Sequence, residues 1–161
     1  MKLVYKIIIL FIFSCTFYSC STVKYFTPVN QEYNTENIAN FYISSTNLIV
    51  NDLRGDNTDQ TKDVIERLML SSYNIFNNNY KEDNIIITID IIEHRAFFTF
   101  MTWNAETILN LNISNENNVL KNIIINSKQS RFNIRGYATA EEVSQRAFDN
   151  AIKDLLDILT Y

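Results

Sequence analysis

The chain has 161 residues, of which 47% are hydrophobic and 20% are charged, and its formal net charge at pH 7 is −4. This length corresponds to one domain that can bury a core of its own, and the composition excludes a disordered body. Because the chain is acidic and has no cluster of basic residues, it is a poor candidate for binding nucleic acid.

The first 20 residues have the layout of an export signal. Lys2 and Lys6 make the start positive, residues 7–13 are an unbroken apolar run, and small polar residues appear between this run and Cys20. The apolar run is too short for a membrane span, which needs about 20 residues. We therefore expect residues 1–20 to be a lipoprotein signal peptide.

Cys20 is the expected site of lipid attachment. Residues 17–20 (Phe-Tyr-Ser-Cys) resemble the lipobox of bacterial lipoproteins, in which a small residue precedes the acylated cysteine. Residues 12–15 (Ile-Phe-Ser-Cys) form a competing site at Cys15, although cleavage there would leave a very short signal. A secreted protein or an uncleaved anchor, with incidental cysteines, is a further alternative. Two or three acyl chains on Cys20 would hold the domain at a membrane for practical purposes permanently.

The residues after Cys20 predict the location and the domain boundaries. Ser21 stands where an Asp would retain a lipoprotein at the inner membrane, which favours the outer membrane on its periplasmic side. Residues 21–40 are polar, contain the only proline, Pro28, and are expected to be a flexible tether reaching at most about 65 Å. Residues 41–161 remain as the folded domain. They contain no cysteine, so no disulfide, thiolate nucleophile or cysteine-based zinc site is expected.

The first half of the domain predicts a strand, a helix and a second strand. Residues 47–53 are a short apolar run between polar turns, which indicates a strand. Residues 60–77 have apolar side chains at helical spacing, with Asp59 or Thr61 able to cap the helix. Residues 84–93 alternate, with Ile85, Ile87, Ile89 and Ile91 on one face, and predict the next strand.

The second half predicts a hairpin and a terminal helix. Apolar residues alternate with asparagines from Thr107 to Ile113, and a turn at 114–118 leads to a further strand at 119–135, with a bulge near Lys128. Thr139 and Glu142 form a capping box, which opens a helix with one apolar stripe. The stripe consists of Val143, Ala147, Ala151, Leu155, Ile158 and Leu159.

The order β-α-β-β-β-α predicts the fold class. Two amphipathic helices need an apolar surface to cover, and a sheet with one apolar face supplies it. We expect a single α+β domain with a four-stranded, largely antiparallel sheet and both helices on one face.

Few residues suggest chemistry. Asp52 and Arg54 are expected to form a structural ion pair at a strand end. His94, the only histidine, is expected to face solvent on the same face as Asp90, and two ligands are too few for a metal site. No triad, phosphate loop or cofactor motif is present, so we expect no catalytic residue, no metal and no cofactor.

Residues 96–103 are unusually aromatic for one segment. An extended chain would place Phe98 and Phe100 on one face and Phe97, Met101 and Trp103 on the other, with a bend near residues 94–96. One of these faces is a candidate for contact with a partner or with lipid. The alternative is that both faces are buried, one by the helices and the other by a loop or the N-terminal linker.

The pattern resembles a known group of envelope proteins. An apolar strand that ends in Asp-x-Arg at 52–54, and a terminal helix with Ala147, Ala151 and the run Asp154-Leu155-Leu156, resemble the YajG-like outer-membrane lipoproteins. More loosely, the chain resembles the auxiliary lipoproteins of lipid-transport ABC systems. The resemblance covers residues 48–159 and implies a non-enzymatic lipoprotein with a protein partner in the cell envelope. The second hypothesis is a surface lipoprotein that binds a ligand. The third is a small hydrolase.

Overall fold

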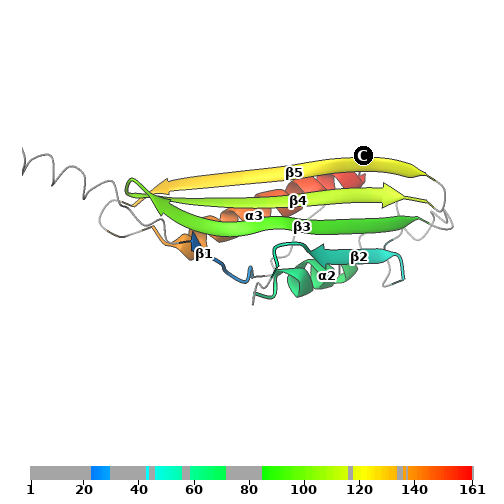
Figure 1. The fold of residues 1–161 in the computed structure, drawn as a ribbon, viewed down its shortest axis with the longest axis horizontal. Helices are drawn as coiled ribbons and strands as arrows, with labels where there is room; N and C mark the ends of the chain where they lie inside the picture. Colours follow the sequence, from blue (N-terminus) through cyan, green and yellow to red (C-terminus); the bar gives the residue numbers. More distant parts are fainter. Residues whose placement is uncertain are drawn as a thin grey trace, which may run out of the picture.

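The computed structural model describes residues 23–29, 43, 46–55, 59–71, 85–115, 118–133, 136 and 138–160. These residues form five strands and two helices (Figure 1). The elements are β1 (Val23–Lys24), β2 (Leu48–Asp52), α2 (Thr61–Ser71), β3 (Ile86–Thr99), β4 (Thr102–Ser114), β5 (Val119–Phe132) and α3 (Ala140–Thr160).

The sheet is built around the long strand β3. β3 pairs with β4 and β4 pairs with β5, both antiparallel. The other edge of β3 is shared, because β2 lies parallel to residues 87–91 and β1 lies antiparallel to residues 96–97. The predicted α+β class and the largely antiparallel sheet are confirmed, but the sheet has a fifth strand. β1 lies within the segment expected to be a flexible tether, and its two residues are too few to give a periodic signal.

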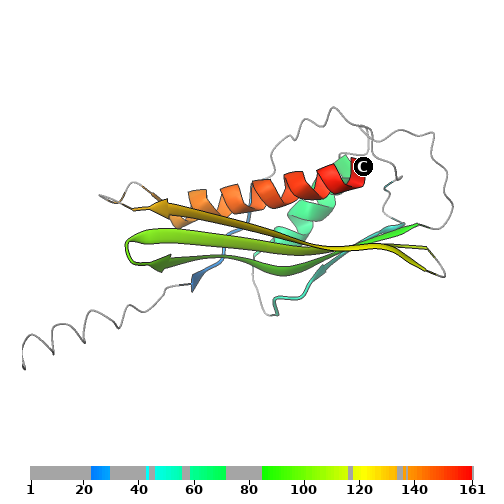
Figure 2. The ribbon, with the colours of Figure 1, turned by 90° about the horizontal axis from the view of Figure 1, so that it is seen from above.

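One face of the sheet carries the core. Ile87, Ile89 and Ile91 on β3 are fully buried, as are Leu109 and Leu111 on β4. Helices α2 and α3 both cover this face (Figure 2), as predicted. Neither of the two described helices is long and apolar enough to cross a membrane.

A bulge in β3 changes which side chains enter the core. The pairing of β3 with β4 shifts between Ile91 and Glu93, so one extra residue is accommodated and the alternation changes parity. Before the bulge the odd-numbered residues of β3 face the core. After the bulge the even-numbered residues His94 and Ala96 face it. The predicted bend near 94–96 is replaced by this bulge and by a hairpin turn at Phe100 and Met101. The bulge expected near Lys128 is absent, because β5 keeps its register with β4 through that point.

The terminal helix begins at a threonine cap, which is one half of the predicted capping box. Thr139 Oγ1 accepts a hydrogen bond from the backbone N–H of Glu142 at 3.1 Å. The carboxylate of Glu142 pairs with Arg131 and Arg146. We expect Thr139→Ala to lower the free energy of unfolding by about 1 kcal/mol, because one backbone donor loses its partner. Urea denaturation measures this, and Thr139→Ser should keep full stability; an unchanged Ala variant would contradict the role of the cap.

Candidate functional site

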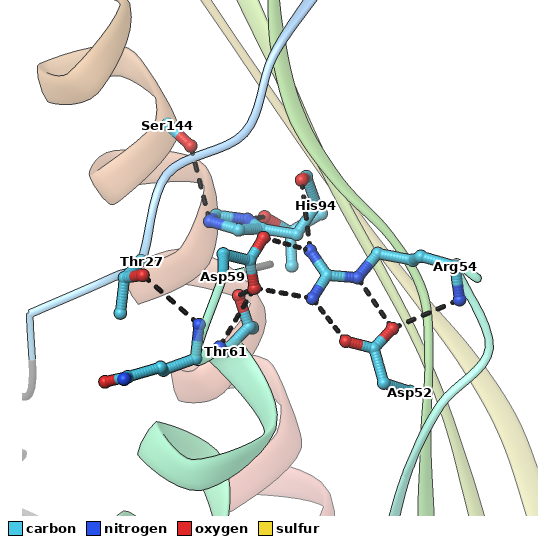
Figure 3. A network of polar contacts seen from close by, with 9 residues as sticks. Thr27, Asp52, Arg54, Asp59, Thr61, His94 and Ser144 are labelled. Atoms are coloured by element: carbon cyan, nitrogen blue, oxygen red, sulfur yellow. Dashed lines mark hydrogen bonds and ion pairs between the residues drawn. The ribbon is translucent and has the colours of Figure 1, made fainter. Parts of the chain in front are cut away.

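The most connected polar group in the described part of the chain is centred on Arg54. Its guanidinium makes two-pronged contacts with two carboxylates: with Asp52 at 2.6 and 2.9 Å, and with Asp59 at 2.7 and 2.8 Å (Figure 3). Arg54 Nη1 also donates to the backbone carbonyl of His94 at 3.4 Å. The cluster therefore joins the end of β2, the start of α2 and the middle of β3. The predicted pair of Asp52 and Arg54 is present, and Asp59 is the partner that the sequence did not indicate.

The charges in this cluster stabilise one another in a buried setting. The Arg54 side chain is only 2% exposed. Burial acts to lower its pKa, but hydrogen bonds to Asp52 and Asp59 outweigh burial and raise it. The hydrogen bond from Arg54 lowers the pKa of Asp52. Burial acts to raise the pKa of Asp59, and hydrogen bonds from Arg54 and Thr61 reverse this and lower it. All three groups are therefore held in their charged forms.

His94 lies beside this cluster in the core, so its predicted solvent-facing position is wrong. It is 1% exposed, and the bulge after Ile91 accounts for the change of face. Its Nδ1 lies 2.9 Å from Thr107 Oγ1, and its Nε2 lies 3.4 Å from Ser144 Oγ (Figure 3). The ring also meets Phe148 edge to face at 5.6 Å. Burial lowers the pKa of His94 to about 4, and the positive charge of Arg54 adds to this.

Residues 23–29 form a strap that passes beside His94 (Figure 3). Thr27 Oγ1 accepts a hydrogen bond from the backbone of Gln60, where α2 begins, at 3.2 Å. Val29 exchanges two hydrogen bonds with the Gln145 side chain of α3, at 2.7 and 3.0 Å. The strap therefore runs from the edge of β3 to both helices. These residues of the expected tether belong to the folded domain.

The contact between Ser144 and His94 does not have the arrangement of a catalytic serine–histidine pair. Both side chains are almost fully buried, and Nδ1 of His94 faces a threonine hydroxyl where a catalytic triad would have a carboxylate. Asp90, expected to share a face with His94, lies on the opposite face of the sheet because of the bulge. Within the described residues, no group of three or more His, Cys, Asp or Glu side chains could hold a metal ion.

No described element covers the face of the sheet away from the helices (Figure 2). This face carries polar side chains together with exposed apolar ones, such as Ile49 and Ile124. Asp90 accepts hydrogen bonds from Asn51 at 2.9 Å and from Asn110 at 3.2 Å, which links three neighbouring strands. The side-chain Oδ1 atoms of Asn110 and Asn112 are shielded from solvent and accept no hydrogen bond from any described residue. The partly buried Asp90 lies on this open face, and its two carboxylate oxygens can accept further hydrogen bonds from a partner.

The aromatic segment folds into a hairpin, and this rearranges the predicted faces. Phe98 and Trp103, expected on opposite faces, are cross-strand neighbours with ring centroids 5.0 Å apart. Phe97 lies on the open face, where Arg95 approaches its ring at 5.6 Å. Phe100 and Met101 form the two-residue turn, where they are 86% and 63% exposed. The candidate contact residues are therefore divided between the sheet and an exposed tip.

The turn at Phe100 and Met101 has an unusual backbone. Both residues have positive φ, 44° and 61°, as a type I′ hairpin turn requires. Asn and Gly are the residues that this turn prefers, and a bulky side chain there costs on the order of 1 kcal/mol or more. The sequence therefore has no ordinary hairpin signal at this position, and a strained turn presents two large apolar side chains to solvent.

Cys20, the predicted lipidation site, and Cys15 lie outside the described residues. No protein-family model matches the chain, and no curated protein gives a significant match to it. The resemblance to YajG-like lipoproteins and to auxiliary lipoproteins of ABC systems stays a prediction.

Proposed function

We propose that this chain is a lipid-anchored envelope lipoprotein that acts as a non-catalytic interaction module in outer-membrane assembly or transport. Its anchor is the acylated Cys20, and its domain faces the periplasm. The location follows from the export signal and from Ser21 after the cysteine.

The position of Cys20 relative to the fold is the observation that carries the proposal. The first described residue, Val23, is already in the sheet, paired with Phe97, and Cys20 precedes it by three positions. Cleavage before Cys20 would therefore remove the export signal and leave every described strand intact. A short polar stretch of two residues, Ser21 and Thr22, would separate the lipid from the domain.

The open face of the sheet is the surface that supports an interaction role. It presents Asp90 with its two asparagine neighbours, and the exposed side chains of Ile49 and Ile124, to whatever docks there. Glu106 lies between Lys128 at 2.8 Å and Arg95 at 3.8 Å on the same face. A surface that mixes amides, paired charges and separate exposed apolar side chains favours a protein partner over a small apolar ligand.

Acylation is tested with a Cys20→Ala variant of the full-length protein. The variant is expressed in bacterial cells that are supplied with a fatty-acid probe. We expect loss of labelling and release of the protein from the membrane fraction. The variant has no thiol at position 20, so it cannot carry the two or three acyl chains that would hold it at the membrane. Cys15→Ala is the matched control and should label normally. Unchanged labelling of Cys20→Ala would contradict the proposal.

The side of the membrane is tested in the same strains. Protease added to intact cells should leave the domain whole if it faces the periplasm. Loss of the domain would instead support the alternative of a surface lipoprotein that binds a ligand.

A further inference from the structure

We propose that the hairpin tip formed by Phe100 and Met101 inserts into the lipid bilayer on which Cys20 is anchored. This inference rests on the proposed acylation and adds a second point of membrane contact. It also assigns a role to the strained turn, which the fold itself does not require.

The position of the anchor places the tip at the bilayer. Cys20 lies three residues before Val23, so the two Cα atoms are at most about 11 Å apart. β1 runs antiparallel to β3, with Val23 opposite Phe97, so the N-terminal end of β1 points toward the β3–β4 turn. Figure 1 shows β1 near the same end of the long sheet as this turn. An acyl chain on Cys20 would therefore be attached within about 11 Å of the Val23 Cα, near the end of the molecule that carries Phe100.

The residues at this end suit a membrane interface. Phe132 pairs with Thr102 beside the tip and is exposed, as is Val23. The tip and its neighbours, residues 23–29, 97–103 and 129–133, contain no acidic residue. Inserting the tip therefore buries no carboxylate of these segments, and the carboxylate of Glu142, which contacts Arg131, stays paired.

The polar residues at the same end are those found at membrane interfaces. The amino group of Lys24 lies 5.6 Å from the centre of the Trp103 ring. Tyr25, the next residue in the chain, is exposed. Tryptophan, tyrosine and lysine side chains keep an apolar body near the acyl chains and a polar group in the headgroup layer. The tip would therefore contact the bilayer through apolar side chains, with the amphipathic side chains of Lys24, Tyr25 and Trp103 around them.

Two exposed apolar side chains bind a bilayer weakly by themselves. The anchor makes this contact intramolecular, so even a weak affinity holds the tip against the surface. The domain would then lie on the bilayer in one orientation. Because the inserting side chains of Phe100 and Met101 carry no charge, their contact with the bilayer should be insensitive to salt.

The experiment uses mature protein purified from cells and reconstituted into phosphatidylcholine vesicles with brominated acyl chains. Trp103 is the only tryptophan and lies two residues after the tip, so its fluorescence reports membrane contact. We expect strong quenching that persists at high salt. Quenching should fall severalfold in a Phe100→Asn, Met101→Gly variant, which still carries the lipid.

This variant separates insertion from folding. Asn and Gly are the preferred residues of the type I′ turn, so the thermal midpoint should stay the same or rise while membrane contact is lost. The matched control changes Val119 and Leu120 to Thr. These side chains are 63% and 50% exposed at the opposite end of the sheet, so quenching should be unchanged.

The outcomes distinguish the two proposals. An acylated protein whose Trp103 is not quenched, or is quenched equally in the tip variant, overturns tip insertion and leaves the anchor intact. An unmodified cysteine in the mass spectrum overturns the proposed function. The same unacylated protein, added to the vesicles at high concentration, still tests the tip, because quenching supports insertion and no quenching overturns it.

Discussion

Arg54→Ala should lower the free energy of unfolding by about 3–5 kcal/mol, which would be the largest effect of any single polar substitution in the described residues. The substitution leaves Asp52 and Asp59 facing each other without the cation that both of them contact. Asp59 is almost fully buried, so solvent cannot take over the role of the guanidinium. Urea denaturation at pH 7 measures the loss.

Two controls identify the cause of this loss. Arg146→Ala removes an exposed arginine that pairs with Glu142 within one helix, and it should change stability by less than about 1 kcal/mol. Replacing Asp52 and Asp59 by Asn in the Arg54→Ala background should recover part of the stability, because the uncompensated charges disappear. A loss below about 1 kcal/mol for Arg54→Ala would contradict a buried charge cluster.

The regular parts of the fold could be predicted because they repeat. Ile87, Ile89 and Ile91 alternate strictly, so their common burial follows from the period of a strand. The terminal helix has both a threonine cap and an apolar stripe, and these two independent signals agree. Asp52 and Arg54 are two positions apart, close enough for their pairing to be predicted from the sequence alone.

The candidate site was harder to predict because it depends on single irregularities. One extra residue in β3 moves His94 from the predicted surface into the core, and no residue type near Ile92 announces a bulge. Asp59 joins Arg54 only because the chain turns back between β2 and α2. The hairpin turn contains Phe100 and Met101, where Asn and Gly would have marked it, so the aromatic segment was predicted as extended.

Two of these irregularities lie along β3, the bulge at its middle and the hairpin turn at its end, and β1 pairs with the strand between them. The strap begins at Val23, opposite Phe97, and reaches Gln145 on α3 at Val29. The same bulge that buries His94 sets which side chains of β3 face Trp103 and the tip. A folded strap, in place of a long tether, therefore keeps the domain close to the proposed anchor.

The stability of the domain should fall by about 3 kcal/mol between pH 6.5 and pH 4 because of His94 alone. Burial lowers the pKa of His94 to about 4 from its usual 6.5. The unfolded chain therefore binds a proton in this range that the folded chain excludes, and each unit of difference is worth about 1.4 kcal/mol. The contribution is complete above pH 6.5 and is lost as the pH falls toward 4. His94 is the only histidine, so no other imidazole titrates in this window.

A His94→Gln variant isolates this contribution. Glutamine keeps hydrogen-bonding atoms near Thr107 but does not titrate, so its stability should be nearly constant from pH 6.5 to 5. The carboxylates of Asp52 and Asp59 have lowered pKa values and lose their contribution only at lower pH, equally in both proteins. The difference in unfolding free energy between wild type and variant should therefore shrink steadily as the pH falls, as measured by urea denaturation at each pH. Parallel pH profiles for the two proteins would show that His94 accepts its proton as readily in the folded core as in the unfolded chain.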